Sequence, residues 1–265
     1  MRWKVMLDFL RDIFSALSHA AGDGADKKEP APAPDVPTVD TVTGWAGDPP
    51  YRYIDVSRYQ GAIDWAQVAA AGYKGAMLKT VSTNRKLSKR ADGLYIDPTF
   101  EDNYKNAKAA GLDVGVYYYT YATSEAMANA ELALVRQAVY DKELTLPVAV
   151  DVEENKLKPM STFDLTNLAA YALEQVEKMG FYAQLYTYTG YSYELDMQRL
   201  AGRWDVWLAD YTGKTPKVDY TYNAHQHTSK GSVPGISGNV DLNVTTLNYP
   251  RIIRKKGLTR LREGA

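Results

Sequence analysis

Three carboxylates stand within four positions of one short stretch, AVDVEEN, at residues 149–155. The stretch continues the apolar run LPVAV, so Asp151, Glu153 and Glu154 fall at the end of a predicted buried strand. Side chains two positions apart on a strand point to the same side, so Asp151 and Glu153 are predicted to project together. Two adjacent carboxyl groups disfavour each other's ionisation, and one of them is expected to keep its proton near neutral pH.

A protonated carboxyl beside an ionised one is the pair that glycoside hydrolysis uses. The acid donates a proton to the leaving oxygen, while the ionised neighbour stabilises positive charge, orients a group or acts as a base. A D-x-E triplet is common, however, and in the alternative reading Glu153 and Glu154 simply begin a solvated loop. The pair therefore needs further residues at the same place before it indicates catalysis.

Polar or aromatic side chains end nearly every predicted strand of the chain. In a barrel of parallel strands, the C-terminal ends of the strands form the active-site face. One acid at one strand end can simply cap the next helix, but so many around one rim favour a functional cleft. In chain order these residues are Asp55, Lys79, Tyr119, Asp151, Glu153, Tyr188, Asp210, Gln226 and Asp241.

The elements that must position these residues alternate between strand and helix. Strands are predicted over 53–56, 75–80, 113–121, 146–153, 181–189, 204–211, 222–229 and 238–245. Helices are predicted over 63–72, 97–111, 124–143 and 161–180, with a short irregular helix over 191–202. Five strand–helix units followed by three strands predict a parallel α/β barrel. An open doubly wound sheet is the alternative, but no Gly-rich phosphate loop follows any strand.

The composition excludes several classes of protein. The chain has 265 residues and is 45% hydrophobic, enough for one large barrel or two small domains. Its net charge of -1 gives no electrostatic case for a nucleic-acid partner. It has no Cys, which rules out disulfides, and only three His, so no metal site is expected. Its 21 Tyr against 5 Phe suit sugar-binding surfaces, or else Tyr replaces Phe in the core.

Both ends of the chain differ in composition from the middle. Residues 1–22 place apolar side chains along one stripe, interrupted by charges that argue against a signal peptide, and predict an amphipathic helix. That helix is expected to dock on its own domain, pair weakly with a second copy, or lie on a membrane surface. Residues 23–50 form a Pro/Ala-rich linker, 51–249 the barrel and 250–265 a basic, solvated tail.

Four blocks of the sequence resemble one family in order and spacing: YIDVSRYQGAIDW, LPVAVDVEEN, WLADYTG and SGNVDLN. Together they resemble glycoside hydrolase family 25, the Chalaropsis-type lysozymes or N-acetylmuramidases. The resemblance implies an irregular barrel of five β/α units followed by three strands. It also implies a peptidoglycan hydrolase that cleaves between N-acetylmuramic acid and N-acetylglucosamine without a metal or organic cofactor.

The resemblance assigns roles to the residues at the strand ends. Glu153 matches the acid catalyst, and Asp55, Asp151 and Asp241 match further active-site acids. The remaining expected substrate contacts are Lys79, Tyr119, Tyr188, Trp207, Asp210 and Gln226, of which Asp210 equally suits a loop or cap acid. Carboxylate activation of water and attack by the substrate's own acetamido oxygen both remain open for the second step.

Two departures from the family pattern touch the rim of the expected groove. Where the family reads close to K-A-T-E-G, this chain has LKTVSTNRK, with Ser82 in place of the glutamate. Where the family often reads W-Q-Y, it has AHQHTS, with His225 and His227 beside Gln226. A cell-wall-binding module with a decayed site is therefore one alternative, and a glycosidase of another amino-sugar polymer such as chitin is another. The expected place of action is the bacterial wall, reached as a phage or prophage endolysin or by non-classical export.

Overall fold

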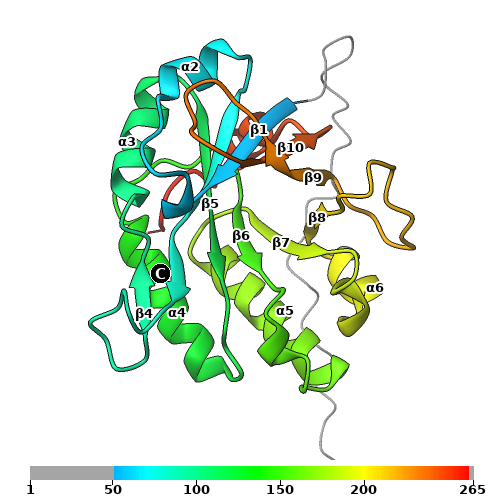
Figure 1. The fold of residues 1–265 in the computed structure, drawn as a ribbon. Helices are drawn as coiled ribbons and strands as arrows, with labels where there is room; N and C mark the ends of the chain where they lie inside the picture. The colour runs from blue at the N-terminus through cyan, green and yellow to red at the C-terminus, as the bar shows by residue number, and fades with distance from the viewer. Residues whose placement is uncertain (1–50, 263–265) are drawn as a thin grey trace, which may run out of the picture. The chain divides into compact units, whose positions relative to one another are not determined.

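Eight strands close into a barrel in the computed structural model, which describes residues 51–262 (Figure 1). Around the barrel the strand order is β1-β10-β9-β8-β7-β6-β5-β2. The predicted closed barrel is therefore confirmed. The strands are β1 (Tyr51–Val56), β2 (Gly75–Lys79), β5 (Asp113–Tyr119), β6 (Val148–Asp151), β7 (Ala183–Tyr188), β8 (Asp205–Ala209), β9 (Ala224–Gly231) and β10 (Val240–Thr245).

A helix follows each of the first five barrel strands, and the last three strands are joined without one, as predicted. Ser124 is the N-cap of α4, and its hydroxyl accepts a hydrogen bond from the Met127 N–H at 3.3 Å. The helices are α2 (Trp65–Ala70), α3 (Phe100–Ala109), α4 (Glu125–Ala138), α5 (Thr162–Lys178) and α6 (Met197–Ala201). Short 3-10 helices are η1 (Arg58–Gln60), η2 (Asn155–Leu157) and η3 (Ser192–Glu194).

One barrel strand runs against the others. The pairs from β1 through β2, β5, β6, β7, β8 and β9 are parallel, but β10 is antiparallel to both β9 and β1. The parallel sheet predicted from the alternation of strands and helices therefore does not extend to β10, because the short connection from β9 leaves no room for a crossover helix. Its reversal brings the start of β10 to the rim where β1 ends, with Asp241 opposite Asp55.

A two-stranded hairpin, which was not predicted from the sequence, lies outside the barrel. It consists of β3 (Val81–Thr83) and β4 (Leu94–Ile96), antiparallel, with Ser82 opposite Tyr95. Each strand has three residues, too few to establish an alternating pattern, and a polar segment separates them. The hairpin sits directly after β2, at the position of the first departure from the family pattern.

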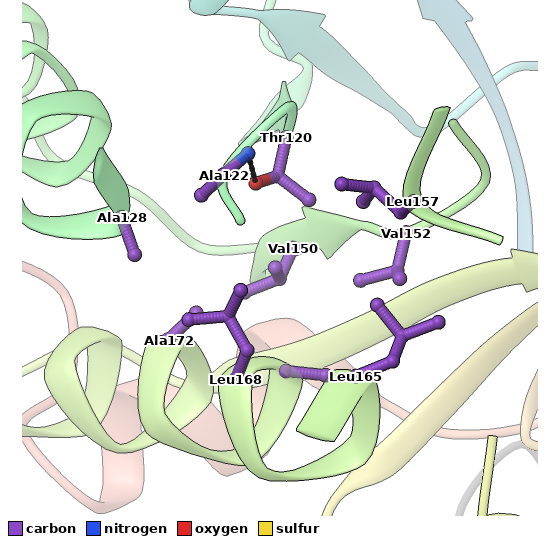
Figure 2. A pocket seen from close by; sticks show the side chains of 10 residues that line it. Thr120, Ala122, Ala128, Val150, Val152, Leu157, Leu165, Leu168 and Ala172 are labelled. Carbon is purple, nitrogen blue, oxygen red and sulfur yellow. Dashed lines mark hydrogen bonds between the residues drawn. The ribbon is translucent and has the colours of Figure 1, made fainter. Parts of the chain in front are cut away.

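The core has two layers, one inside the barrel and one between the strands and the helices. Tyr53, Met77, Tyr186 and Trp207 pack inside the barrel. Behind β6, Val150 and Val152 point toward helix α5 across a small apolar cavity of about 10 Å³ (Figure 2). The side chains alternate along this segment, so Asp151 and Glu153 belong to the other face. The cavity is no larger than one water molecule and is part of the packed core.

The chain after the barrel is not the predicted solvated tail. Helix α7 (Tyr249–Lys255) buries Tyr249, Pro250 and Ile253, and the Arg262 N–H donates to the Met179 carbonyl at 2.9 Å. Apolar residues between the basic ones let this segment pack while its charges stay in solvent. The predicted helix over 1–22 and linker over 23–50 lie outside the described residues. Within residues 51–262, none of the helices has the length and apolar character needed to cross a membrane.

Candidate active site

A pocket of about 140 Å³ opens at the rim formed by the C-terminal ends of the parallel strands. Eight of the ten residues that the sequence singled out line it. The sequence reading missed Tyr117 and Tyr186, although each stands two positions before a predicted strand-end tyrosine and so shares its face. The lining residues are Asp55, Lys79, Tyr117, Tyr119, Asp151, Glu153, Tyr186, Trp207, Gln226 and Asp241.

The predicted D-x-E pair points into this pocket from the end of β6. The Val152 N–H donates to the Tyr186 carbonyl at 2.9 Å, which keeps the chain extended past the last residue of the strand. Asp151 and Glu153 therefore stay on the same side. Asp151 is 3% exposed, and its Oδ1 has no hydrogen-bond partner among the described residues. Burial raises the pKa of Asp151 well above its usual value, and the charge of Glu153 adds to the shift.

Glu153 is an acid whose pKa lies near neutral pH. Burial raises the pKa of Glu153 to about 7; Lys79 opposes the shift, while Asp241 and Glu154 add to it. The sequence reading attributed the shift to repulsion by Asp151. Loss of water is the larger cause, because a half-closed pocket solvates a carboxylate poorly.

Glu154, the third acid of the stretch, does not line the pocket. It is the N-cap of η2, where its Oε1 accepts a hydrogen bond from the Lys156 N–H at 2.9 Å. Its backbone carbonyl accepts from the Tyr191 hydroxyl at 2.9 Å. The three acids are thus divided into two that line the pocket and one that caps a helix.

Lys79 is the one cation among the ten lining residues of the described chain. Its ammonium lies 5.6 Å from the ring centroid of Tyr117 and 5.1 Å from that of Tyr119. It lowers the pKa of both Asp151 and Glu153, against the larger effect of burial. The acids therefore face a positive charge that limits how strongly they hold their protons.

Asp55 and Asp241 form a second acidic pair on neighbouring strands. The Oδ2 of Asp55 accepts hydrogen bonds from Gln226 Nε2 at 2.8 Å and from Asn243 Nδ2 at 2.9 Å. Burial raises the pKa of Asp55 well above its usual value, and the charge of Asp241 raises it further. Burial also raises the pKa of Asp241, and a hydrogen bond between the two carboxyls partly offsets that rise. Asp55 is therefore the member that holds the shared proton.

Both the oxygen and the nitrogen of the Gln226 amide make hydrogen bonds within the protein. Its Oε1 accepts from the Tyr186 hydroxyl at 2.9 Å and from the Tyr211 hydroxyl, while its Nε2 donates to Asp55. The side chain is buried. Its hydrogen bond orients the Asp55 carboxyl, an arrangement that no sequence pattern signals. Gln226 also lines the pocket, and its contact with substrate stays a prediction.

Trp207 lies deeper than the sequence suggested. It is 1% exposed, its Nε1 donates to Asn243 Oδ1 at 2.9 Å, and its ring centroid is 4.6 Å from that of Tyr186. It forms the floor of the pocket and belongs to the barrel core. A side chain so completely buried offers little surface to a ligand.

Two predicted site residues do not line the pocket. Tyr188 packs beside Tyr191, with ring centroids 5.8 Å apart. Asp210 accepts hydrogen bonds from the Thr212 N–H at 2.9 Å and the Thr189 hydroxyl at 2.8 Å. Hydrogen bonding by Thr212 lowers the pKa of Asp210. These contacts favour the alternative reading of Asp210 as a loop acid.

The two histidines beside Gln226 lie on β9 with their rings 6.1 Å apart. His225 Nε2 is 3.1 Å from the Asp210 carbonyl oxygen, and burial lowers the pKa of His227. Across residues 51–262, no three His, Cys, Asp or Glu side chains are grouped so that they could hold a metal ion. Neither histidine is among the residues that line the pocket.

A closed α/β barrel with several acids in one rim pocket is the architecture of a barrel glycosidase. The sequence model of glycosyl hydrolases family 25 matches residues 54–236, and the chain belongs to that family. An autolytic lysozyme of Clostridium acetobutylicum is 30% identical over 197 residues, or 71% of this chain. The match spans 54% of that relative's length.

Solved structures share the fold. A bacterial lysozyme from Streptomyces coelicolor superposes with a TM-score of 0.64 at 24% identity, over 74% of this chain and 92% of its own. A family 25 glycosyl hydrolase from Bacillus anthracis gives a TM-score of 0.62 at 22% identity, over 73% and 88%. The irregular barrel that the resemblance implied is therefore present.

Proposed function

We propose that this chain is a muramidase, which hydrolyses the bond between N-acetylmuramic acid and N-acetylglucosamine in peptidoglycan. The observation that carries the proposal is Glu153, an acid with a pKa of about 7 beside three other acids in one pocket of a family 25 barrel. The name of the Clostridium relative, an autolytic lysozyme, supports the same substrate. The place of action is then the bacterial cell wall.

Glu153 acts as the general acid in this proposal. Its proton passes to the glycosidic oxygen as the bond from that oxygen to the muramic acid C1 breaks, and the bonding electron pair leaves with the oxygen. Positive charge then develops at C1. We assign the stabilisation of that charge to the Asp241 carboxylate, whose hydrogen bond with Asp55 favours the ionised form against the effect of burial.

Asp151 can assist an attack by the substrate's own acetamido oxygen on C1, by accepting a hydrogen bond from the acetamido N–H. Its Oδ1 is buried and lacks a partner among the described residues, and a buried acceptor without a donor is costly. The N–H of the acetamido group is a donor of the required kind. While Asp151 holds that N–H, the acetamido oxygen bonds to C1. A water molecule then bonds to C1 as the bond from C1 to the acetamido oxygen breaks, and a proton of that water returns to the Glu153 carboxylate.

The proposal is tested by Glu153→Gln, a change that keeps the shape of the side chain and removes its proton. We expect clearing of purified cell walls to fall by about a thousandfold or more. Glu154→Gln is the matched control, since Glu154 lies next to Glu153 but caps η2, and we expect it to keep most of the activity. Circular dichroism and thermal unfolding establish that both variants fold.

Mass spectrometry of the digested wall identifies the bond. Muramic acid at the new reducing ends supports the proposal, whereas glucosamine there contradicts it. Release of fragments from chitin but not from the wall would favour a different amino-sugar polymer as substrate. Binding of the wild-type chain to walls without any release would favour a wall-binding module.

A further inference from the structure

The turn between β3 and β4, residues 84–93, is a cationic surface that the acidic pocket does not account for. It contains four basic residues within six positions, RKLSKR. Arg90 pairs with Asp92 at 2.6 Å. Arg85, Lys86 and Lys89 are exposed, and none of the three has a carboxylate within ion-pair distance among residues 51–262. A full chain with a net charge of -1 thus concentrates positive charge at one place.

This turn is held in shape by its own polar groups. The Asn84 Oδ1 accepts from the Lys86 N–H at 2.9 Å, and the Ser88 hydroxyl donates to the Leu94 carbonyl at 2.6 Å. Gly93 adopts a φ of 79°, which favours glycine, and its carbonyl accepts from the Asn84 N–H at 2.8 Å. None of these bonds uses a charged group of the three free cations, so their charges are not needed for the fold of the turn.

The hairpin adjoins the pocket at the same rim. β3 begins two residues after Lys79, which lines the pocket. The Thr80 N–H, between β2 and β3, donates to the carbonyl of the lining residue Tyr117 at 2.8 Å, and the Asp97 N–H, directly after β4, donates to the Thr80 carbonyl at 2.7 Å. Both ends of the hairpin are therefore held at the strand ends that carry Lys79 and Tyr117. Figure 1 draws β4 and its turn at the end of the barrel toward which the arrow of β5 points.

The chemistry of the turn matches a charged peptide. Leu87, 43% exposed, stands at its tip among the three cations, so the turn offers an apolar contact as well as positive charge. Muramic acid carries a short peptide with free carboxylates and small apolar side chains. The residues that line the pocket include four acids and one cation, so the pocket offers little to bind such carboxylates, and the peptide must leave the pocket while the neutral sugars occupy it.

We propose that Arg85, Lys86 and Lys89 bind the carboxylates of the stem peptide on the muramic acid of the substrate, a proposal that rests on the function proposed above. Exposed ion pairs are individually weak, but three of them on a pre-shaped turn favour one substrate over another. The enzyme therefore prefers peptide-bearing glycan strands to bare ones. Its hairpin acts in substrate selection and takes no part in bond cleavage.

The test compares two substrates that differ only in the peptide: soluble glycan strands with stem peptides, and the same strands after an amidase has removed them. In a variant with Arg85, Lys86 and Lys89 all changed to Gln, we expect KM for the peptide-bearing strands to rise about fivefold, with kcat unchanged. We expect no change on the bare strands. Added salt should reduce the wild-type preference and leave the variant unaffected.

A control for the loss of surface charge changes Lys74 and Lys105 to Gln, two exposed lysines of which Lys74 precedes β2 at the opposite rim. It should behave as the wild type. Equal loss on both substrates, or no loss on either, overturns the proposal. So does a loss seen only with walls that retain phosphate-bearing polymers, which would make those polymers the occupant.

A binding measurement distinguishes failure of the muramidase proposal from failure of the peptide-site proposal. Sedimentation or calorimetry with the peptide-bearing strands measures their Kd for the wild-type chain and for the triple variant. If the wild type cleaves neither strand but binds the peptide-bearing one about fivefold more tightly than the triple variant does, the muramidase proposal fails and the peptide site stands. Equal Kd values overturn the peptide site.

Discussion

The ammonium of Lys79 limits how strongly the acids of the pocket hold their protons. Burial raises the pKa of both Asp151 and Glu153, and the charge of Lys79 opposes that rise. Without Lys79, both pKa values would be higher. The working acid must be protonated before each turnover. In the proposed mechanism, where Glu153 is the general acid, the cation sets the upper end of the pH range of activity.

Replacing Lys79 with Met should extend activity to higher pH. The wild type is expected to lose kcat/KM as pH rises through about 7, because Glu153 then gives up its proton. Without the neighbouring cation the ionised form is less stable, so the pKa of Glu153 rises and the basic limb moves upward by about one pH unit. A pH profile of kcat/KM gives the pH at which activity falls, and this value does not depend on how much the substitution changes the maximum activity.

Lys79→Arg is the control for this change, since it keeps the charge and should keep the limb where it is. A Lys79→Met profile whose limb stays in place or moves to lower pH would show that Glu153 is not the titrating acid.

Helix α4 holds the β5–α4 loop through a buried carboxyl that catalysis does not use. Glu131 is 1% exposed and accepts hydrogen bonds from the Thr120 hydroxyl at 2.6 Å and the Tyr121 N–H at 2.8 Å. That loop connects Tyr119 at the pocket with the helix. Burial raises the pKa of Glu131 from 4.5 to about 7, even though these hydrogen bonds favour its charged form.

This group makes the stability of the fold depend on pH. Its folded pKa is the higher one, so the folded chain binds the proton more tightly than the unfolded chain. The contribution is complete below pH 4.5 and is lost as pH rises through about 7. Across that interval the free energy of unfolding of the wild type should fall by about 3 kcal/mol more than that of Glu131→Gln, which stays neutral.

Denaturant unfolding at several pH values from 4 to 8 measures the difference. Glu125→Gln, on the exposed first turn of the same helix, should track the wild type. Parallel curves for the wild type and Glu131→Gln would contradict the assignment.

At the scale of the whole molecule, the sequence predicts those features of the fold that depend on residues close together along the chain. The alternation of strands and helices is local, and it predicts the barrel; the i, i+2 rule places Asp151 and Glu153 on one face for the same reason. The burial of Trp207 and the bonds of Gln226 arise only when distant strands close into a ring. The short strands β3 and β4 likewise depend on contacts that no short window of sequence contains.

Helix α7 is the largest of these non-local features, and it covers the end of the barrel opposite the pocket. The Tyr249 hydroxyl accepts from Gln184 Nε2 at 2.8 Å and donates to Asp205, at the starts of β7 and β8. Arg254 pairs with Asp113, the first residue of β5, at 3.1 Å. Ile253 is 0% exposed and packs in the inner core beneath them.

Ile253→Ala should therefore weaken the fold while sparing catalysis. Loss of a fully buried Ile side chain costs about 3 kcal/mol, and a domain of this size loses about 2–4 °C of Tm for each kcal/mol. We expect Tm to fall by about 6–12 °C, with wall clearing at 25 °C little changed because the pocket lies at the other rim. Arg251→Ala, exposed on the same helix, should leave Tm within about 2 °C of the wild type. If Ile253→Ala is as stable as the wild type, residues 250–262 behave as the solvated tail predicted from the sequence. Loss of activity without loss of stability would mean that the two ends of the barrel are coupled.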